Sequence, residues 1–376
     1  MSMERGSREL NPLLRLGALG QSVWYDYITR DLLTSGKLAR LITEDGLRGM
    51  TSNPTIFDKA IAGSRLYDDD IRRLSDRGRT AGEIFETLAV ADVRAACDLF
   101  HPLYQQSGGT DGFVSLEVSP TLANDTAGTI HEAERLWSAV GRPNAMIKIP
   151  GTRAGLRAVT QCIAGGINVN VTLLFSVERY AEVIEAYLAG MEQRLERGPS
   201  LQSVASVASF FVSRVDGKVD LLLGTPDHPL RGKIAIANAA AAYALFERTL
   251  ESARWERLAH AGARPQRPLW ASTSTKDPRL PDIYYVEALA APRTVNTMPP
   301  ETLDAYRDHG KPAIRIHESV EAAPAQLKAL ADAGIDLSAV TAELELDGVA
   351  KFAASHAAVL SGIEAKAGEL ATASRR

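Results

Sequence analysis

The sequence has few cysteines and no long hydrophobic run. Cys97 and Cys162 are the only two cysteines among 376 residues, and their separation matches no metal-binding or redox spacing. A reducing compartment is therefore expected. No run of about 18 apolar residues indicates a membrane span, and the charged N-terminus lacks the apolar segment of a signal peptide. We expect a cytoplasmic protein that does not bind membranes.

A basic surface stripe and a glycine-rich nucleotide motif are also missing. Lys and Arg number 42 against 46 Asp and Glu, a formal net charge of −4, and the basic residues do not cluster. Nucleic acid is therefore not an expected partner. Neither a Walker sequence nor a GxGxxG pattern occurs, which argues against a nucleotide cofactor. The seven histidines are scattered without metal-binding spacing. We predict neither a cofactor nor a bound metal.

The sequence does contain short apolar or β-branched runs that alternate with longer helical patterns. Eight runs occur at 22–26, 46–53, 113–118, around Lys148, and at 167–174, 206–214, 268–274 and 294–298. This alternation favours parallel strands joined by helices, and eight strands can close into a barrel with one core. The alternative is an open doubly wound sheet, which is disfavoured because no glycine-rich turn follows the first run.

We therefore predict an α/β protein with a (β/α)8 TIM-type barrel. One domain would span 21–376, after an N-terminal segment at 1–20. The connection 215–266 is longer than a simple loop and contains helical patterns, so we expect it to cover the barrel mouth or to form a subunit contact. Helices are predicted at about 320–334 and 338–370, and residues 313–317 resemble a strand.

Polar residues stand at or near the end of each run. They are Asp26, Thr51, Asn53, Glu117, Lys148, Asn170, Thr172, Ser209, Arg214, Ser272, Ser274, Asn296 and Thr297. Active sites of such barrels lie at the carboxyl ends of the strands. A single polar strand end is an ordinary solvated terminus, but a ring of them around one mouth predicts a site.

Lys148 is the candidate nucleophile, because it lies between Ile147 and Ile149. Burying an ammonium costs several kcal/mol unless it is paired or loses its proton. A neutral amine attacks a ketone and forms a Schiff base. A lysine near a strand end more often extends its amine to water. Only the ring of polar strand ends favours the active-site interpretation of Lys148.

Asp26 and Glu117 are the candidate proton carriers. Imine chemistry needs an acid and a base, and two carboxylates in different environments can divide that work. The alternative is that they form structural ion pairs with Lys148 or Arg214.

Other polar residues are candidate substrate ligands. Asn53 and Asn170 can bind carbonyl and hydroxyl groups or cap strand ends, and Thr51 and Thr172 are more often plain strand residues than ligands. A phosphate cradle is predicted from Ser209, Ser272, Arg214 and Lys276.

Several segments resemble transaldolase, in its longer bacterial type, over roughly residues 20–365. The matching segments are GMTSNPTIF at 49–57, VSLEV at 114–118, IKIPGT at 147–152, INVNVTLLFS at 167–176, SFFVSR at 209–214 and ASTSTK at 271–276. The resemblance implies a (β/α)8 barrel without a cofactor that acts on sugar phosphates. It would transfer a dihydroxyacetone unit from sedoheptulose 7-phosphate to glyceraldehyde 3-phosphate in the pentose phosphate pathway, giving erythrose 4-phosphate and fructose 6-phosphate.

The resemblance also implies roles for individual residues. Lys148 would form the imine, and Asp26 would take the proton of the C4 hydroxyl. Glu117 would act as acid and base through a water held by Thr172. The dihydroxyacetone moiety would be held by Asn53 and Asn170. The acceptor and phosphate end would be shaped by Ser209, Phe211 and Arg214.

The sequence departs from the family pattern at several positions. Phe210 and Ser213 replace a proline and a glycine of shorter members, and Ser274 replaces an arginine, with Lys276 two residues further on. Arg214 is thus a better phosphate candidate than Lys276. A related aldolase that releases free dihydroxyacetone and a non-catalytic sugar-phosphate sensor remain alternatives, and the protein is expected to be a monomer or a homodimer.

Overall fold

Eight parallel strands form a closed barrel in a computed structural model that describes residues 11–373. Each strand pairs with the next in sequence, and the last pairs with the first. The strands are β1 (Gln21–Asp26), β2 (Gly49–Thr51), β3 (Phe113–Glu117), β4 (Ala145–Pro150), β5 (Val169–Leu174), β6 (Ser206–Phe211), β7 (Arg267–Ala271) and β8 (Thr294–Met298). The predicted (β/α)8 barrel is confirmed. Several strands are shorter than predicted, and β6 ends before Arg214.

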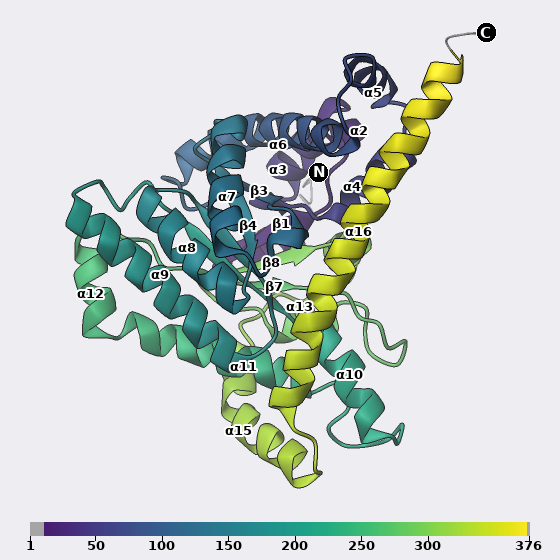
Figure 1. The fold of residues 1–376 in the computed structure, drawn as a ribbon. Helices are drawn as coiled ribbons and strands as arrows, with labels where there is room; N and C mark the ends of the chain where they lie inside the picture. The colour runs from purple at the N-terminus through teal and green to yellow at the C-terminus, as the bar shows by residue number, and fades with distance from the viewer. Residues whose placement is uncertain (1–10, 374–376) are drawn as a thin grey trace, which may run out of the picture.

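Helices surround the barrel (Figure 1). They are α1 (Pro12–Ala18), α2 (Arg30–Thr34), α3 (Lys37–Glu44), α4 (Pro54–Ala62), α5 (Asp68–Ser75), α6 (Ala81–Gln106), α7 (Thr126–Val140), α8 (Arg153–Gly165), α9 (Val177–Arg197), α10 (Ser213–Leu223), α11 (Ile234–Leu250), α12 (Ala253–His260), α13 (Tyr284–Ala288), α14 (Pro300–His309), α15 (Ile316–Asp332) and α16 (Leu337–Ala373), with a 3₁₀ turn η1 (Pro120–Leu122). Residues 1–10 of the predicted N-terminal segment lie outside the described part of the chain. The rest of that segment contains α1, which packs on β1 and α14. None of the described helices has the length and apolar character needed to cross a bilayer.

The predicted strand at 313–317 is wrong. Residues 311–315 are irregular, and α15 begins at Ile316. Apolar residues such as those of this segment occur at the start of a helix as well as in a strand. Because α15 packs against α11 and the barrel is already closed by the β8–β1 pairing, no edge is left for another strand.

The helix α16 is the element that crosses the molecule. Figure 1 shows it in yellow, running along the barrel from the α10 side to the α5 side. It packs against α4, α5, α6, α10 and β5, and its buried residues include Leu344, Phe352, Val359 and Ile363. The predicted C-terminal helices are therefore confirmed, and α16 lies beside the strand ends. The α11 helix of the 215–266 connection instead packs on α9 and α15, in the outer helix layer.

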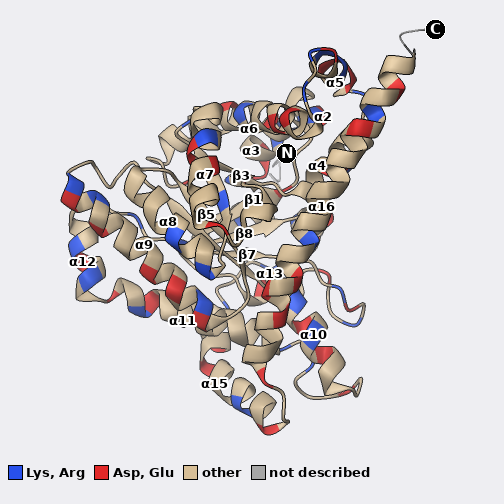
Figure 2. Ribbon diagram, viewed as in Figure 1, with Lys and Arg blue, Asp and Glu red and all other residues tan. Residues whose placement is uncertain are grey.

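Charges of both signs alternate on the outer helices. Figure 2 marks the positions of basic residues in blue and of acidic residues in red, and both colours occur along the ribbons of α9 and α12. Arg254 of α12 pairs with Glu185 and Glu192 of α9, and its Nη2 lies 2.8 Å from Glu192 Oε2. Exposed pairs of this kind each add little stability, roughly 0–1 kcal/mol. Their main consequence is a surface of mixed charge over these helices.

The first turn of α8 packs closely against the end of β4, the strand that carries Lys148. Gly155 makes this close approach possible because it has no side chain. The Gly155 N–H donates to Thr152 Oγ1 at 3.0 Å, which caps the helix. A methyl group at Gly155 would overlap the carbonyl oxygen of Pro150, the last residue of β4.

Gly155→Ala is expected to lower the free energy of unfolding by about 1–3 kcal/mol, because overpacking forces the backbone to shift. Urea denaturation measures it. Gly165→Ala is the matched control, since Gly165 is in the same helix and a methyl group there meets no atom within 4 Å. Equal stability of the two variants would contradict the close-approach argument.

Candidate active site

The predicted residues meet in a cavity of about 220 Å³ at the carboxyl ends of the strands. Its walls include Asp26, Thr51, Asn53, Lys148, Thr172, Ser209, Phe211, Arg214, Ser272 and Lys276. Of the predicted site residues, Glu117 and Asn170 do not line this cavity. Glu117, Lys148 and Asn170 are nevertheless register partners on β3, β4 and β5, so the barrel places them in one row.

Lys148 is buried at 5% exposure, so it does not extend its amine to water. Its Nζ donates to the carbonyl oxygen of Ser52 at 3.2 Å and lies 3.5 Å from Glu117 Oε2. The ring of Phe352, from α16, lies 5.5 Å from Nζ. The amine thus has one carboxylate partner and an aromatic wall, and it faces the cavity.

Asp26 ends β1 and is held by threonines. Thr51 Oγ1 donates to Asp26 Oδ1 at 2.7 Å and also lies 2.7 Å from Thr297 Oγ1. Burial raises the pKa of Asp26, while the Lys148 charge and the Thr51 hydrogen bond oppose the rise. A carboxylate with a raised pKa is a better proton acceptor than an exposed one.

Glu117 ends β3, and its side chain is buried. Burial raises the pKa of Glu117 to about 7, against the opposing charge of Lys148. Apart from the Lys148 ion pair, neither carboxylate oxygen has a hydrogen-bond partner among the described residues, and the same holds for Thr172 Oγ1. A carboxyl that titrates near neutral pH can both donate and accept a proton. The alternative expectation of an ion pair is thus also met, since Glu117 pairs with Lys148.

The two asparagines occupy different positions. Asn170 Nδ2 donates to Ser115 Oγ at 3.0 Å, and Asn170 Oδ1 accepts from Ser209 Oγ at 2.6 Å. Asn170 therefore fixes Ser209, which does line the cavity. Asn53 Oδ1 accepts from the Ile56 N–H at 3.0 Å and caps α4. Asn53 thus caps a helix rather than a strand end, and it also borders the cavity.

Basic residues lie at the far side of the cavity. Arg214 lies at the start of α10, with its guanidinium carbon 5.1 Å from the Phe211 ring centre. Its Nη1 is buried without a hydrogen-bond partner among the described residues, and burial lowers the pKa of Arg214. Lys276 is exposed and donates to Ser274 Oγ at 2.9 Å. An unpaired, partly desolvated guanidinium is suited to a bidentate anion such as phosphate.

The positions that depart from the family pattern support this side of the cavity. Ser213 Oγ lies 3.0 Å from Ser272 Oγ, and the Ser213 N–H donates to the Ser272 carbonyl oxygen at 3.0 Å. Ser272 has a φ of 56°, an uncommon left-handed conformation for a serine. These bonds hold Ser272 at the cavity wall.

Comparisons with known proteins decide the family. The family model described as Transaldolase/Fructose-6-phosphate aldolase matches residues 23–363. The chain belongs to this family. A transaldolase from Parafrankia sp. is 50% identical over 96% of this chain and 99% of the relative. One from Acidothermus cellulolyticus is 52% identical over 92% and 94%, and "Transaldolase 2" from Nostoc sp. is 47% identical over 95% and 98%.

Identity near one half over almost the whole of both chains supports transaldolase function for this chain. The protein is therefore an enzyme that transfers aldehyde or ketone residues. The arrangement around Lys148 suits that class, because it combines one buried amine with two carboxylates of raised pKa. The described residues contain no group of three or more His, Cys, Asp or Glu side chains placed to hold a metal ion.

Sequence reasoning missed several residues that line the cavity of this transaldolase-family barrel. Pro299, Glu301 and Phe352 were not predicted, and Thr297 was noted only as a polar strand end. Pro299 and Glu301 directly follow β8, so the rule that active sites lie at strand ends was sufficient to find them. Phe352 had no such signal, because it is one apolar residue in a helix that lies far along the chain from the other site residues.

Proposed function

We propose that Lys148 forms a Schiff base with a ketose phosphate and that the enzyme transfers a dihydroxyacetone unit through it. The donor would be sedoheptulose 7-phosphate and the acceptor glyceraldehyde 3-phosphate, giving erythrose 4-phosphate and fructose 6-phosphate in the pentose phosphate pathway. The observation that carries this proposal is the position of the Lys148 amine, which is buried, faces the cavity and lies 3.5 Å from a carboxylate. We retain the expectations of one barrel domain at 21–376, a cytoplasmic location, and a monomer or homodimer.

The residues divide the chemistry as follows. The Lys148 amine attacks the C2 carbonyl, and Glu117 supplies the proton with which the C2 oxygen leaves as water, assisted by a water on Thr172. Asp26 then takes the proton of the C4 hydroxyl. The C3–C4 bond breaks, its electron pair moves into the iminium, and the aldose departs. The acceptor aldose then reacts with the dihydroxyacetone unit bound to Lys148 by the reverse of these steps.

Binding is assigned to the rest of the cavity wall. Thr51, Asn53 and Asn170 would hold the dihydroxyacetone moiety, with Asn170 acting beside Ser209, to which it is hydrogen-bonded. The acceptor and phosphate end would be formed by Ser209, Phe211, Arg214, Ser272 and Lys276. Arg214 is the strongest phosphate ligand in this proposal, since its buried Nη1 has no hydrogen-bond partner among residues 11–373.

Borohydride trapping tests the proposal directly. The enzyme is incubated with fructose 6-phosphate, reduced, and analysed by intact mass and peptide mapping. A stable adduct on the peptide that contains Lys148 is expected. The absence of any adduct would favour the non-catalytic sugar-phosphate sensor instead.

The description of the matching family also includes fructose-6-phosphate aldolase, so the acceptor requirement needs its own assay. Consumption of fructose 6-phosphate is measured with and without erythrose 4-phosphate. Turnover that depends on the acceptor is expected for a transferase. Appreciable release of free dihydroxyacetone without an acceptor would identify an aldolase.

Glu117 should make stability depend on pH. Its pKa rises from 4.5 to about 7 in the folded protein, so the folded state binds more protons than the unfolded state between these values. Stability is then lost as pH rises through this window. Relative to Glu117→Gln, the native protein is expected to lose on the order of 1–3 kcal/mol between pH 5 and 7.5 in urea denaturation. Parallel pH profiles for the two proteins would contradict the raised pKa.

Arg214→Met is expected to raise the KM for fructose 6-phosphate by roughly 10–100-fold, the equivalent of one or two lost hydrogen bonds to a charged group. The side chain of methionine retains contact with Phe211. Steady-state kinetics with fructose 6-phosphate and with unphosphorylated fructose provide the control. If both substrates weaken equally, Arg214 does not bind the phosphate.

A further inference from the structure

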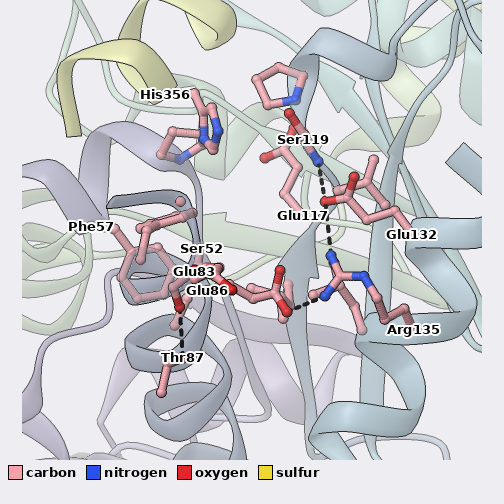
Figure 3. Close-up of a pocket in the computed structure, with 18 of the residues that line it drawn as sticks. Ser52, Phe57, Glu83, Glu86, Thr87, Glu117, Ser119, Glu132, Arg135 and His356 are labelled. Carbon is pink, nitrogen blue, oxygen red and sulfur yellow. Dashed lines mark hydrogen bonds and ion pairs between the residues drawn. The ribbon is translucent and has the colours of Figure 1, made fainter. Parts of the chain in front are cut away.

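Glu117 is one of the residues that line a second cavity, of about 860 Å³ (Figure 3). It is bordered by α4, α6, α7 and the segment after β3, and by His356 of α16. Polar residues on its wall include Ser52, Glu86, Ser119, Glu132 and Arg135. It is separate from the cavity at the strand ends, which Lys148 and Arg214 line.

Glu117 faces this second cavity, whereas Lys148 faces the first. Asn53 borders both, and the Lys148–Glu117 ion pair at 3.5 Å joins the two sides. On α16, Phe352 lines the first cavity and His356, one turn later, lines the second. The ion pair of the nucleophile and its proton partner therefore lies between the two cavities.

The wall near Glu117 is built from groups that hydrogen-bond water. The Ser119 N–H donates to Glu132 Oε1 at 3.0 Å, and Arg135 pairs with both Glu132 and Glu86. Figure 3 shows this chain of contacts beside Glu117. Both Glu117 oxygens are buried and have no hydrogen-bond partner among the described residues. Buried polar groups are normally satisfied by protein or by ordered water, so these oxygens, which have only the Lys148 amine nearby, call for a further partner such as a water.

Imine chemistry requires a path for water that differs from the path of the sugar. Forming the imine breaks the C2–O bond and releases one water, and hydrolysis consumes one. A bound sugar phosphate would fill much of the 220 Å³ cavity, which limits exchange through the mouth. The second cavity offers a route that the sugar does not occupy.

We propose that the second cavity is the water side of the active site, through which water released at imine formation leaves and water for hydrolysis enters past Glu117. This inference rests on the proposed Schiff-base function. In imine formation Glu117 gives its proton to the C2 hydroxyl of the carbinolamine, and the oxygen departs as water into the second cavity. In hydrolysis Glu117 takes one proton from a water of that cavity and the oxygen bonds to C2. The remaining C2 hydroxyl proton then passes to the Lys148 nitrogen, the C–N bond breaks and the C2 carbonyl re-forms.

Loss of ¹⁸O from the C2 oxygen of fructose 6-phosphate tests the route. Each imine cycle exchanges this oxygen with solvent only if the released water escapes. Ser119→Leu adds bulk next to Glu117, in an extended backbone conformation that leucine adopts. We expect several-fold less label loss per imine formed than in the native enzyme, with imine formation measured by borohydride trapping. Ser119→Ala, which adds no bulk, should behave as the native enzyme.

A second variant guards against misfolding of the first. Gly82→Phe projects from α6 at a position where a Cβ meets no atom within 4 Å, and Gly82 lines the second cavity. It should also lower label loss per imine, with Gly82→Ala as its control. Unchanged label loss in a folded variant that still traps the imine would overturn the water route alone. Failure to trap an imine in the native enzyme would instead overturn the Schiff-base function.

Discussion

Replacing Lys148 by methionine is expected to lower transaldolase turnover by about 10⁴-fold or more, the effect of removing a covalent nucleophile. Methionine keeps most of the volume that the lysine stem fills between β3 and β5, so the barrel should still fold. Lys276 also lines the cavity of about 220 Å³, but it is exposed, so it is not expected to replace the buried amine of Lys148. The variant should also give no borohydride adduct with fructose 6-phosphate.

Lys276→Met is the matched control, because Lys276 lines the same cavity but is exposed and bonded to Ser274. That variant should still form an adduct on Lys148. Intact mass after reduction distinguishes the two variants, and urea denaturation shows whether both are folded. An adduct that persists in Lys148→Met would show that another amine is the nucleophile.

The barrel and most of its site could be predicted because strand ends carry two signals at once. A strand such as β4 reads as a short apolar run, and the polar Lys148 near its carboxyl end marks the mouth of the barrel. In a closed parallel barrel all carboxyl ends meet on one side, so the topology alone brings Asp26, Lys148 and Ser209 together. No distance between residues had to be known.

Other features depend on packing that no local pattern records. Phe352 reaches Lys148 only because α16 lies across the strand ends, and the apolar stripe of a helix does not say which surface it will cover. Glu117 was expected to line the same cavity as Lys148, yet it lines a different one. The direction in which a strand-end side chain leans depends on the loops around it, and those loops have no periodic signal.

Asp26 should be essential for cleavage and dispensable for the imine. Asp26→Asn keeps the shape of the side chain and can still hydrogen-bond Thr51, which lies at 2.7 Å in the native protein. An amide does not accept a proton from the C4 hydroxyl. Turnover is therefore expected to fall by about 10²–10⁴-fold, the usual contribution of a general base. The adduct on Lys148 should still form, since the attack on C2 does not use Asp26.

The experiment compares two readouts on one variant. Borohydride trapping with fructose 6-phosphate should yield an adduct with the mass of the intact hexose phosphate, because the C3–C4 bond stays closed. The native enzyme should yield mainly the smaller dihydroxyacetone adduct. Thr51→Val is the matched control, since it removes the hydrogen bond to Asp26 but leaves the carboxylate, and its turnover should fall far less. Normal turnover of Asp26→Asn, or loss of the adduct, would assign the proton transfer to a different residue.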